Sequence, residues 1–225
     1  MFIHHLRSLV FRVLLLSLAV YLYIANPGRL DFTTPPDTLL DGAFLGIVWL
    51  MLAVGTLYRL FPNKRIPMGA RKHFISPAVA AASSTSRKPL HKGARTVVIV
   101  WLACNAALLF GLHLYGLLTP MTAILLALFY AVCDLICILF FCPFQTFFMR
   151  NRCCAECRIY NWDYFMICTP LLLFPSAYSL SLIALAAAAL VRWELAARRN
   201  PEAFQNLNCT ECEDRLCLIR KPLIK

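Results

Sequence analysis

Charged residues are scarce in this chain, and the sequence patterns of common soluble enzymes are missing. Only 15% of the 225 residues are charged and 60% are apolar, whereas about a quarter of a soluble domain is charged. There is no glycine-rich phosphate loop, no HExxH helix and no GxSxG elbow, which argues against the common nucleotide-binding proteins and hydrolases. So few charges cannot cover a water-facing surface, and we therefore expect an integral membrane protein.

Five apolar stretches are long enough to cross a bilayer as helices, which takes roughly 17 to 25 residues. They are residues 9–25, 39–61, 96–117, 121–142 and 164–191. The runs are continuous rather than alternating, which indicates helices and not a barrel. Tyr23 stands where signal cleavage needs a small residue, so we expect the first helix to be retained. The predicted fold is all-α and polytopic, with four transmembrane helices and a fifth, proline-interrupted segment.

Acidic residues are absent between residues 62 and 95, and this absence orients the chain. The basic residues of that loop are Lys64, Arg65, Arg71, Lys72, Arg87, Lys88, Lys92 and Arg95. The positive-inside rule then predicts that this loop and the N-terminus are cytoplasmic, with loop 26–38 outside. Anionic headgroups would attract the loop at about 1 kcal/mol per nearby charge. With Phe74 as its one aromatic residue for base stacking, no nucleic-acid partner is expected.

The predicted organisation starts with a transmembrane region, residues 1–142, whose third and fourth helices form a tight antiparallel hairpin. A cysteine-rich cytoplasmic loop follows at 143–163, then the fifth membrane segment at 164–191 and a cysteine-rich tail at 192–225. A cytoplasmic membrane is the expected location.

The fifth segment has two explanations, because a straight helix over residues 164–191 would measure about 42 Å, too long for one untilted crossing. Pro170 and Pro175 interrupt it. One alternative is a kinked crossing that leaves the tail outside. The other is a re-entrant hairpin that turns near Pro175 and returns the tail to the cytoplasm, which the basic residues of the tail favour.

Eleven cysteines are unevenly distributed, and two clusters, CCAEC and CTECEDRLC, lie in polar segments after the fourth helix. The candidate metal ligands are Cys153, Cys154, Cys157, Cys209, Cys212 and Cys217. Paired Cys-x-x-Cys motifs present thiolates to a tetrahedral ion at about 2.3 Å. A reducing cytoplasm disfavours disulfides.

Three chemistries fit these clusters. Zinc held by Cys154, Cys157, Cys209 and Cys212 is the leading prediction. An iron–sulfur cluster that also uses Cys153 or Cys217 is the second, and a dithiol redox pair is the third. The remaining cysteines inside apolar runs are expected to act as small apolar residues: Cys104, Cys133, Cys137 and Cys168.

One acid, Asp134, falls inside a predicted membrane helix, where a lone charge costs several kcal/mol. Counting from a turn centred near Thr119 and Pro120, Asp134 lies level with Asn105. An interhelical hydrogen bond of about 1 kcal/mol is one explanation. The alternative is a proton-relay or substrate-binding acid, which makes Asp134 and Asn105 candidate catalytic residues.

Residues 158–164 join the CCAEC cluster to the fifth segment. Three of them predict an aromatic belt at the membrane interface: Tyr160, Trp162 and Tyr164. Asn161 or Asp163 is then expected to cap the next helix. Alternatively, Asp163 and Arg158 line a headgroup or substrate site, so Asp163 is a third catalytic candidate.

The stretch NRCCAECRIYNWDYFM, with the Thr169-Pro170 that follows it and the later CTEC, resembles a group of short bacterial integral membrane proteins with a CCxxC…CxxC module. The resemblance covers the last third of the chain. It implies a bacterial cytoplasmic (inner) membrane and a paired cysteine module, and it brings no activity.

Three functional hypotheses follow. The first is a redox protein that passes electrons from a cytoplasmic donor or partner subunit to a quinone or membrane thiol through cysteine-bound iron or a dithiol. The second is a transporter or lipid-handling protein with a structural zinc module and Asp134 and Asn105 at the working site. The third is a quinone-linked thiol–disulfide oxidoreductase.

Overall fold

The computed structural model describes residues 2–26, 30–61, 93–149 and 157–199, and every regular element in these ranges is a helix. The long helices are α1 (Phe2–Ala25), α2 (Leu39–Leu60), α5 (Gly93–Leu114), α6 (Pro120–Leu139) and α8 (Ala177–Arg199). All five are long and apolar enough to cross a membrane. The predicted polytopic helical membrane fold is therefore confirmed.

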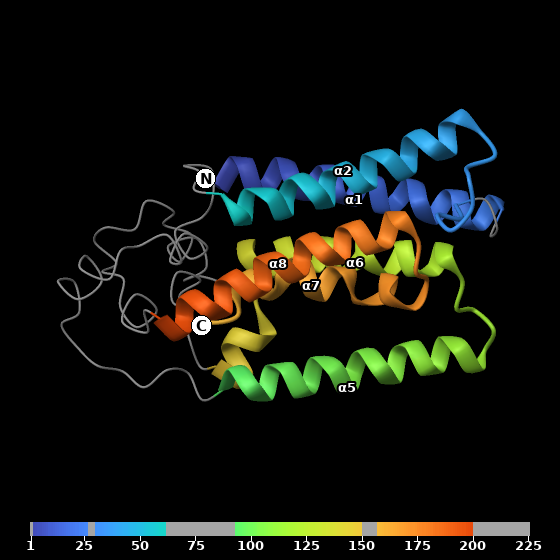
Figure 1. Ribbon diagram of the computed structural model, residues 1–225. Helices are drawn as coiled ribbons and strands as arrows, with labels where there is room; N and C mark the ends of the chain where they lie inside the picture. The colour runs from blue at the N-terminus through green and yellow to red at the C-terminus, as the bar shows by residue number, and fades with distance from the viewer. Residues whose placement is uncertain (1, 27–29, 62–92, 150–156, 200–225) are drawn as a thin grey trace.

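The long helices lie with their axes roughly aligned in a layered bundle, in which α1 and α5 run one way and α2, α6 and α8 run the other (Figure 1). α1 and α2 form one side, α6 and α8 the middle, and α5 the opposite side. α1 packs against α6, and α2 packs against α8. Close approach of α1 and α6 rests on small side chains, because Ala19 of α1 and Ala123, Ala127 and Ala131 of α6 are all fully or almost fully buried.

The chain turns between α5 and α6 earlier than predicted. α5 ends at Leu114, and Gly116 adopts a left-handed conformation with φ of 68°, which glycine adopts without steric cost. Thr119 then caps α6, where its side chain accepts from the Thr122 amide and Pro120 occupies the first turn. α5 and α6 run antiparallel as predicted, but α5 packs mainly against the short π-helix η2 (Phe144–Met149).

The fifth membrane segment is the re-entrant hairpin of the two alternatives. It enters through η4 (Tyr160–Trp162), α7 (Asp163–Cys168) and η5 (Thr169–Leu173), turns, and returns as α8. Ser176 and Ser179 fix the turn, because each side chain accepts a hydrogen bond from the other's backbone N–H. α8 extends past residue 191 to Arg199, helped by an alanine-rich stretch at 184–190 with high helix propensity.

The beginning of α1 and the ends of α2 and α8 lie at the same end of the molecule (Figure 1). This is the arrangement that a cytoplasmic N-terminus and a cytoplasmic tail require. The basic loop, apart from its last three residues at the start of α5, and the tail beyond Arg199 lie outside the described residues.

Candidate functional site

Arg12 is the most deeply buried charged side chain on α1, with 5% of its surface exposed. Its Nη1 donates to the backbone oxygen of Ala131 at 2.6 Å and lies 3.5 Å from the Asp134 carboxylate. Its Nη2 donates to the Tyr164 hydroxyl at 3.3 Å. The Nε atom is buried and has no hydrogen-bond partner. Arg12 thus links α1 to α6 and α7 while one of its donors stays unused.

Asp134 is therefore paired with Arg12, and the predicted partnership with Asn105 is not formed. The Asn105 amide donates to the Thr169 hydroxyl at 2.7 Å and accepts from the Tyr130 hydroxyl at 3.0 Å. The reason lies in the turn: with α5 ending at Leu114 and α6 starting at Pro120, Asn105 is level with Tyr130, about one helical turn from Asp134. Asn105 connects α5 to α6 and η5.

Arg59, in the last turn of α2, forms the second buried ion pair. Its Nη2 donates to Asp163 at 2.6 Å and its Nη1 to Asn161 at 2.9 Å. The guanidinium also lies over the rings of Tyr160 and Tyr164, 5.0 and 5.7 Å from their centroids. Asn161 and Asp163 both bind Arg59. Asp163 Oδ1 also accepts from the Tyr164 backbone N–H at 2.9 Å in the first turn of α7, whereas the N-cap residue, Trp162, makes no side-chain cap. Tyr160 and Tyr164 are buried, so the predicted interfacial belt is wrong for them.

Arg158 does not join Asp163. It forms a bidentate ion pair with Glu194 of α8, at 2.8 and 2.6 Å, and Trp162 donates to the same carboxylate at 2.8 Å. The backbone oxygen of Arg158 accepts from the Trp193 indole at 2.9 Å. These contacts fasten the start of the hairpin to the last turns of α8.

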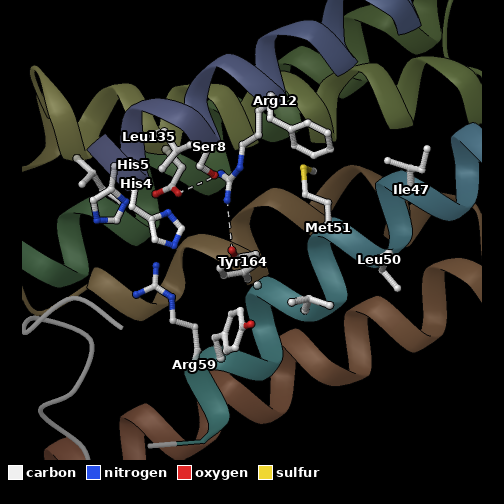
Figure 2. A pocket seen from close by; sticks show the side chains of 16 residues that line it. His4, His5, Ser8, Arg12, Ile47, Leu50, Met51, Arg59, Leu135 and Tyr164 are labelled. Atoms are coloured by element: carbon white, nitrogen blue, oxygen red, sulfur yellow. Dashed lines mark hydrogen bonds and ion pairs between the residues drawn. The ribbon is translucent and has the colours of Figure 1, made fainter. Parts of the chain in front are cut away.

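Arg12 and Arg59 both face a cavity of about 390 Å³, which we call the arginine cavity. Figure 2 shows the side chains of Arg12, His4 and Arg59 gathered around Tyr164, with His5 next to His4. The His5 Nε2 atom is buried without a hydrogen-bond partner. The remaining lining residues are Ser8, Phe11, Ile47, Leu50, Met51, Val54, Gly55, Tyr58, Asp134, Leu135 and Ile138.

The arginine cavity lies between α1 and α2 and has an apolar rim. Phe11 of α1 and Ile47 and Leu50 of α2 line it, and 45%, 45% and 58% of these side chains are exposed. Exposed apolar residues in the middle of membrane helices face lipid. The cavity therefore has a charged interior and an edge that acyl chains can reach.

A second cavity, of about 290 Å³, lies on the other side of Asp134, and we call it the thiol pocket. Four cysteines line it: Cys133, Cys137, Cys142 and Cys157. Cys137 lies in the last turn of α6, and Cys142 follows the end of that helix. Cys133 and Cys137, expected to act only as small apolar residues, thus share a pocket with Cys157 of the CCAEC cluster.

The two buried acids separate the cavities. Asp134 lines both of them, while Asp163 lines the thiol pocket and its partner Arg59 lines the arginine cavity. Two of the three catalytic candidates therefore lie at one wall, and Asn105 lies apart from it.

Of the six candidate metal ligands, Cys157 alone falls within the described residues; Cys153, Cys154, Cys209, Cys212 and Cys217 lie outside them. Among the residues that the structure describes, no group of three or more His, Cys, Asp or Glu side chains could hold a metal ion. Cys157 is buried in one apolar cluster with Trp193 and Ala197 of α8. The two cysteine segments therefore leave the described bundle from neighbouring positions, after Arg199 and before Cys157.

Sequence reasoning missed Arg12 and Arg59 as site residues. The available signal was that both arginines fall inside apolar stretches, where an ionisable residue indicates a functional site.

The comparisons with known proteins add no relative: no family model, no curated protein and no solved structure matches this chain.

Proposed function

We propose that this chain is a lipid-handling membrane protein whose working site is the arginine cavity, and that its ligand is an anionic lipid with a phosphate headgroup. The observation that carries the proposal is the pair of buried arginines, Arg12 and Arg59, facing one cavity that opens on an apolar rim. Of the three hypotheses drawn from the sequence, this is the second, with Arg12 and Arg59 taking the place of Asn105 beside Asp134.

The chemistry of arginine supports an anionic headgroup. A charged side chain in the membrane costs several kcal/mol or more and is found where it serves a ligand, an ion path or a partner. The guanidinium fork matches phosphate oxygens and forms short, charge-assisted hydrogen bonds with them. Arg12 has a buried, unused Nε donor, and His5, which lines the same cavity, has an unpartnered Nε2.

The apolar lining of the arginine cavity favours an amphiphilic ligand over a free anion. Phe11, Leu50, Met51 and Val54 line the cavity beside the arginines. A lipid could thus place its phosphate between Arg12 and Arg59 and leave its acyl chains between α1 and α2, without leaving the bilayer.

In this proposal, Asp134 competes with the lipid phosphate for Arg12. Its carboxylate lies 3.5 Å from Arg12, a longer contact than the 2.6 Å between Arg59 and Asp163. A phosphate that displaces Asp134 would bind the Arg12 guanidinium more strongly than the carboxylate does. Asp134 would then be free to take up a proton, which couples headgroup binding to protonation in the membrane.

The proposal retains a cysteine-bound metal module, with zinc as the leading ion and an iron–sulfur cluster as the alternative. Its support is positional: Cys157, the last cysteine of CCAEC, packs with Trp193 and Ala197 near the end of α8, the helix that precedes the second cysteine segment in the chain. The module would lie in the cytoplasm beneath the arginine cavity, where it would brace the hairpin. A bacterial inner membrane, suggested by the resemblance, is the proposed location.

A thermal-shift measurement on the purified full chain in neutral detergent tests the ligand. Dioctanoyl phosphatidate should raise the melting temperature, and dioctanoylglycerol, which has the same chains and no phosphate, should not. The double variant Arg12→Gln/Asp134→Asn removes both charges together, which a folded protein tolerates better than an unpaired buried charge. It should lose the phosphatidate effect.

The matched control is the double variant Arg158→Gln/Glu194→Gln, which removes an ion pair outside the arginine cavity. It should melt at a lower temperature but keep the full shift with phosphatidate. Equal stabilisation of the wild-type chain by both lipids, or by neither, would contradict the proposal.

A further inference from the structure

We propose that the thiol pocket binds the ring of a quinone and that Cys137 and Cys142 reduce it, forming a disulfide. This inference does not depend on the lipid proposal: it concerns the other cavity, and the one side chain that the two proposals share is Asp134, which lines both cavities. Either proposal can fail alone.

The first support is the convergence of thiols from separate parts of the chain. Cys133 and Cys137 lie on α6, Cys142 lies in the non-helical stretch after it, and Cys157 precedes η4. Cys137 and Cys142 are five residues apart in the chain, and both line the pocket. Cys142 is outside the helical ladder of α6, so its sulfur can approach that of Cys137 to the roughly 2.05 Å of a disulfide with little cost to α6.

The second support is the wall of the pocket, which suits a flat apolar ring. Trp101, Phe129, Tyr130, Phe144 and Tyr160 line it together with the thiols. Trp101 packs edge to face on Tyr130, with ring centroids 4.9 Å apart. Aromatic walls bind planar rings by stacking and edge contacts.

The third support is an unpaired donor at the same place. The Trp101 Nε1 atom is buried and has no hydrogen-bond partner. A tryptophan indole normally finds an acceptor when it is buried, and a quinone carbonyl is such an acceptor. Phe129 also lines the pocket and is 50% exposed on the outer surface of α6, which leaves a route to lipid for an isoprenoid or alkyl tail.

The reaction balances within the pocket. Each thiol loses one proton and one electron as the bond between Cys137 Sγ and Cys142 Sγ forms. The quinone takes up the two electrons and two protons and leaves as the quinol. Asp134 also lines the pocket, and in this proposal its carboxylate passes a proton from thiol to ring.

The test uses the anaerobically purified, fully reduced chain and decylubiquinone, whose ring is fully substituted and so does not add thiols as a less substituted quinone does. We expect one equivalent to be reduced to quinol, seen as the loss of quinone absorbance. Alkylation and mass spectrometry should then show two fewer free thiols, with Cys137 linked to Cys142.

Cys137→Ser and Cys142→Ser should each abolish quinol formation, and Cys104→Ser, on α5 outside the pocket, should leave it unchanged. Trp101→Phe keeps an aromatic ring but removes the indole N–H donor. It should weaken decylubiquinone binding about tenfold, as expected for the loss of one hydrogen bond. An unchanged thiol count, or a disulfide that excludes Cys137, would overturn the inference. Unaltered turnover in both serine variants would do the same.

Discussion

The hydroxyl of Tyr164 occupies the space that a side chain at position 55 would need. Gly55 of α2 faces the Tyr164 ring so closely that a Cβ atom there would collide with the hydroxyl and the adjacent ring carbons. The glycine thus allows Tyr164 to reach Arg12 across the floor of the arginine cavity. A single missing methyl group on one helix sets the position of a buried hydrogen bond between two others.

Gly55→Ala should therefore displace Tyr164 and break its contact with Arg12. We expect the free energy of unfolding to fall by about 1 to 3 kcal/mol, the usual cost of overpacking, and phosphatidate binding to weaken. Gly46→Ala on the same helix is the control, because nothing lies within 4 Å of its added Cβ. The measurement is thermal unfolding of the two variants. Equal melting temperatures would show that Tyr164 can move aside without loss of stability.

Asp134→Asn should increase the affinity for phosphatidate. The substitution removes the anion that competes for Arg12 and leaves an arginine without a charged partner. We expect roughly tenfold tighter binding, equivalent to about 1.4 kcal/mol, together with a lower melting temperature in the absence of lipid. Titration of the variant with dioctanoyl phosphatidate measures this, and a loss of affinity would mean that Asp134 itself holds the ligand.

Glu194→Gln should weaken the hairpin without touching the cavity. Glu194 accepts from both Arg158 and Trp162, so its carboxylate ties η4 to α8. Hydrogen bonds to charged groups contribute about 1.5 to 3 kcal/mol, and we expect a loss of that order in chemical unfolding. Phosphatidate should bind as it does to the wild-type chain; an impaired affinity would show that the Arg158–Glu194 pair shapes the site.

If the N-terminus is cytoplasmic, as the positive-inside rule predicts, the turn of the re-entrant hairpin should be accessible from outside the cell. In intact cells, a membrane-impermeant maleimide should label Pro175→Cys, at the exposed turn, and Asp37→Cys, in the exposed loop between α1 and α2. The unaltered chain should remain unlabelled from that side. Labelling of Asp37→Cys but not Pro175→Cys would place the turn inside the bilayer and not at its far surface.

The cysteine module predicts bound metal. Elemental analysis of anaerobically purified protein should find one zinc per chain and no sulfide, and Cys154→Ser and Cys209→Ser should both lose the metal. Cys104→Ser, on α5, should retain it. Iron with sulfide would select the cluster alternative, whereas a metal-free wild-type chain would remove the module from the account.

The number and course of the membrane helices were predictable because hydropathy depends on local composition alone. The re-entrant turn was one of two alternatives, since Pro170 and Pro175 indicate an interruption but not its direction. The structure decides it through packing of α7 and η5 against α6 and α8. The wrong pairing of Asn105 with Asp134 came from a misplaced helix end. Residues 115–117 continue the apolar pattern, but the helix ends before Gly116, which adopts a left-handed conformation.

The candidate site was only partly predictable. Asp134 and Asp163 could be singled out as acids at unusual places, but their partners Arg12 and Arg59 come from α1 and α2, far away in sequence. No periodicity connects such residues, because the packing of α1 on α6 and of α2 on α8 brings them together. The gathering of Cys137 and Cys142 depends on where α6 ends, which composition alone does not fix.

Native mass spectrometry tests the central claim most directly. The delipidated full chain is offered equal amounts of dioctanoyl phosphatidate and dioctanoylglycerol. We predict a one-to-one complex with phosphatidate in the wild-type chain and its loss in Arg12→Gln/Asp134→Asn. Equal adducts with both lipids, or an undiminished phosphatidate complex in that double variant, would contradict a phosphate site at Arg12 and Arg59.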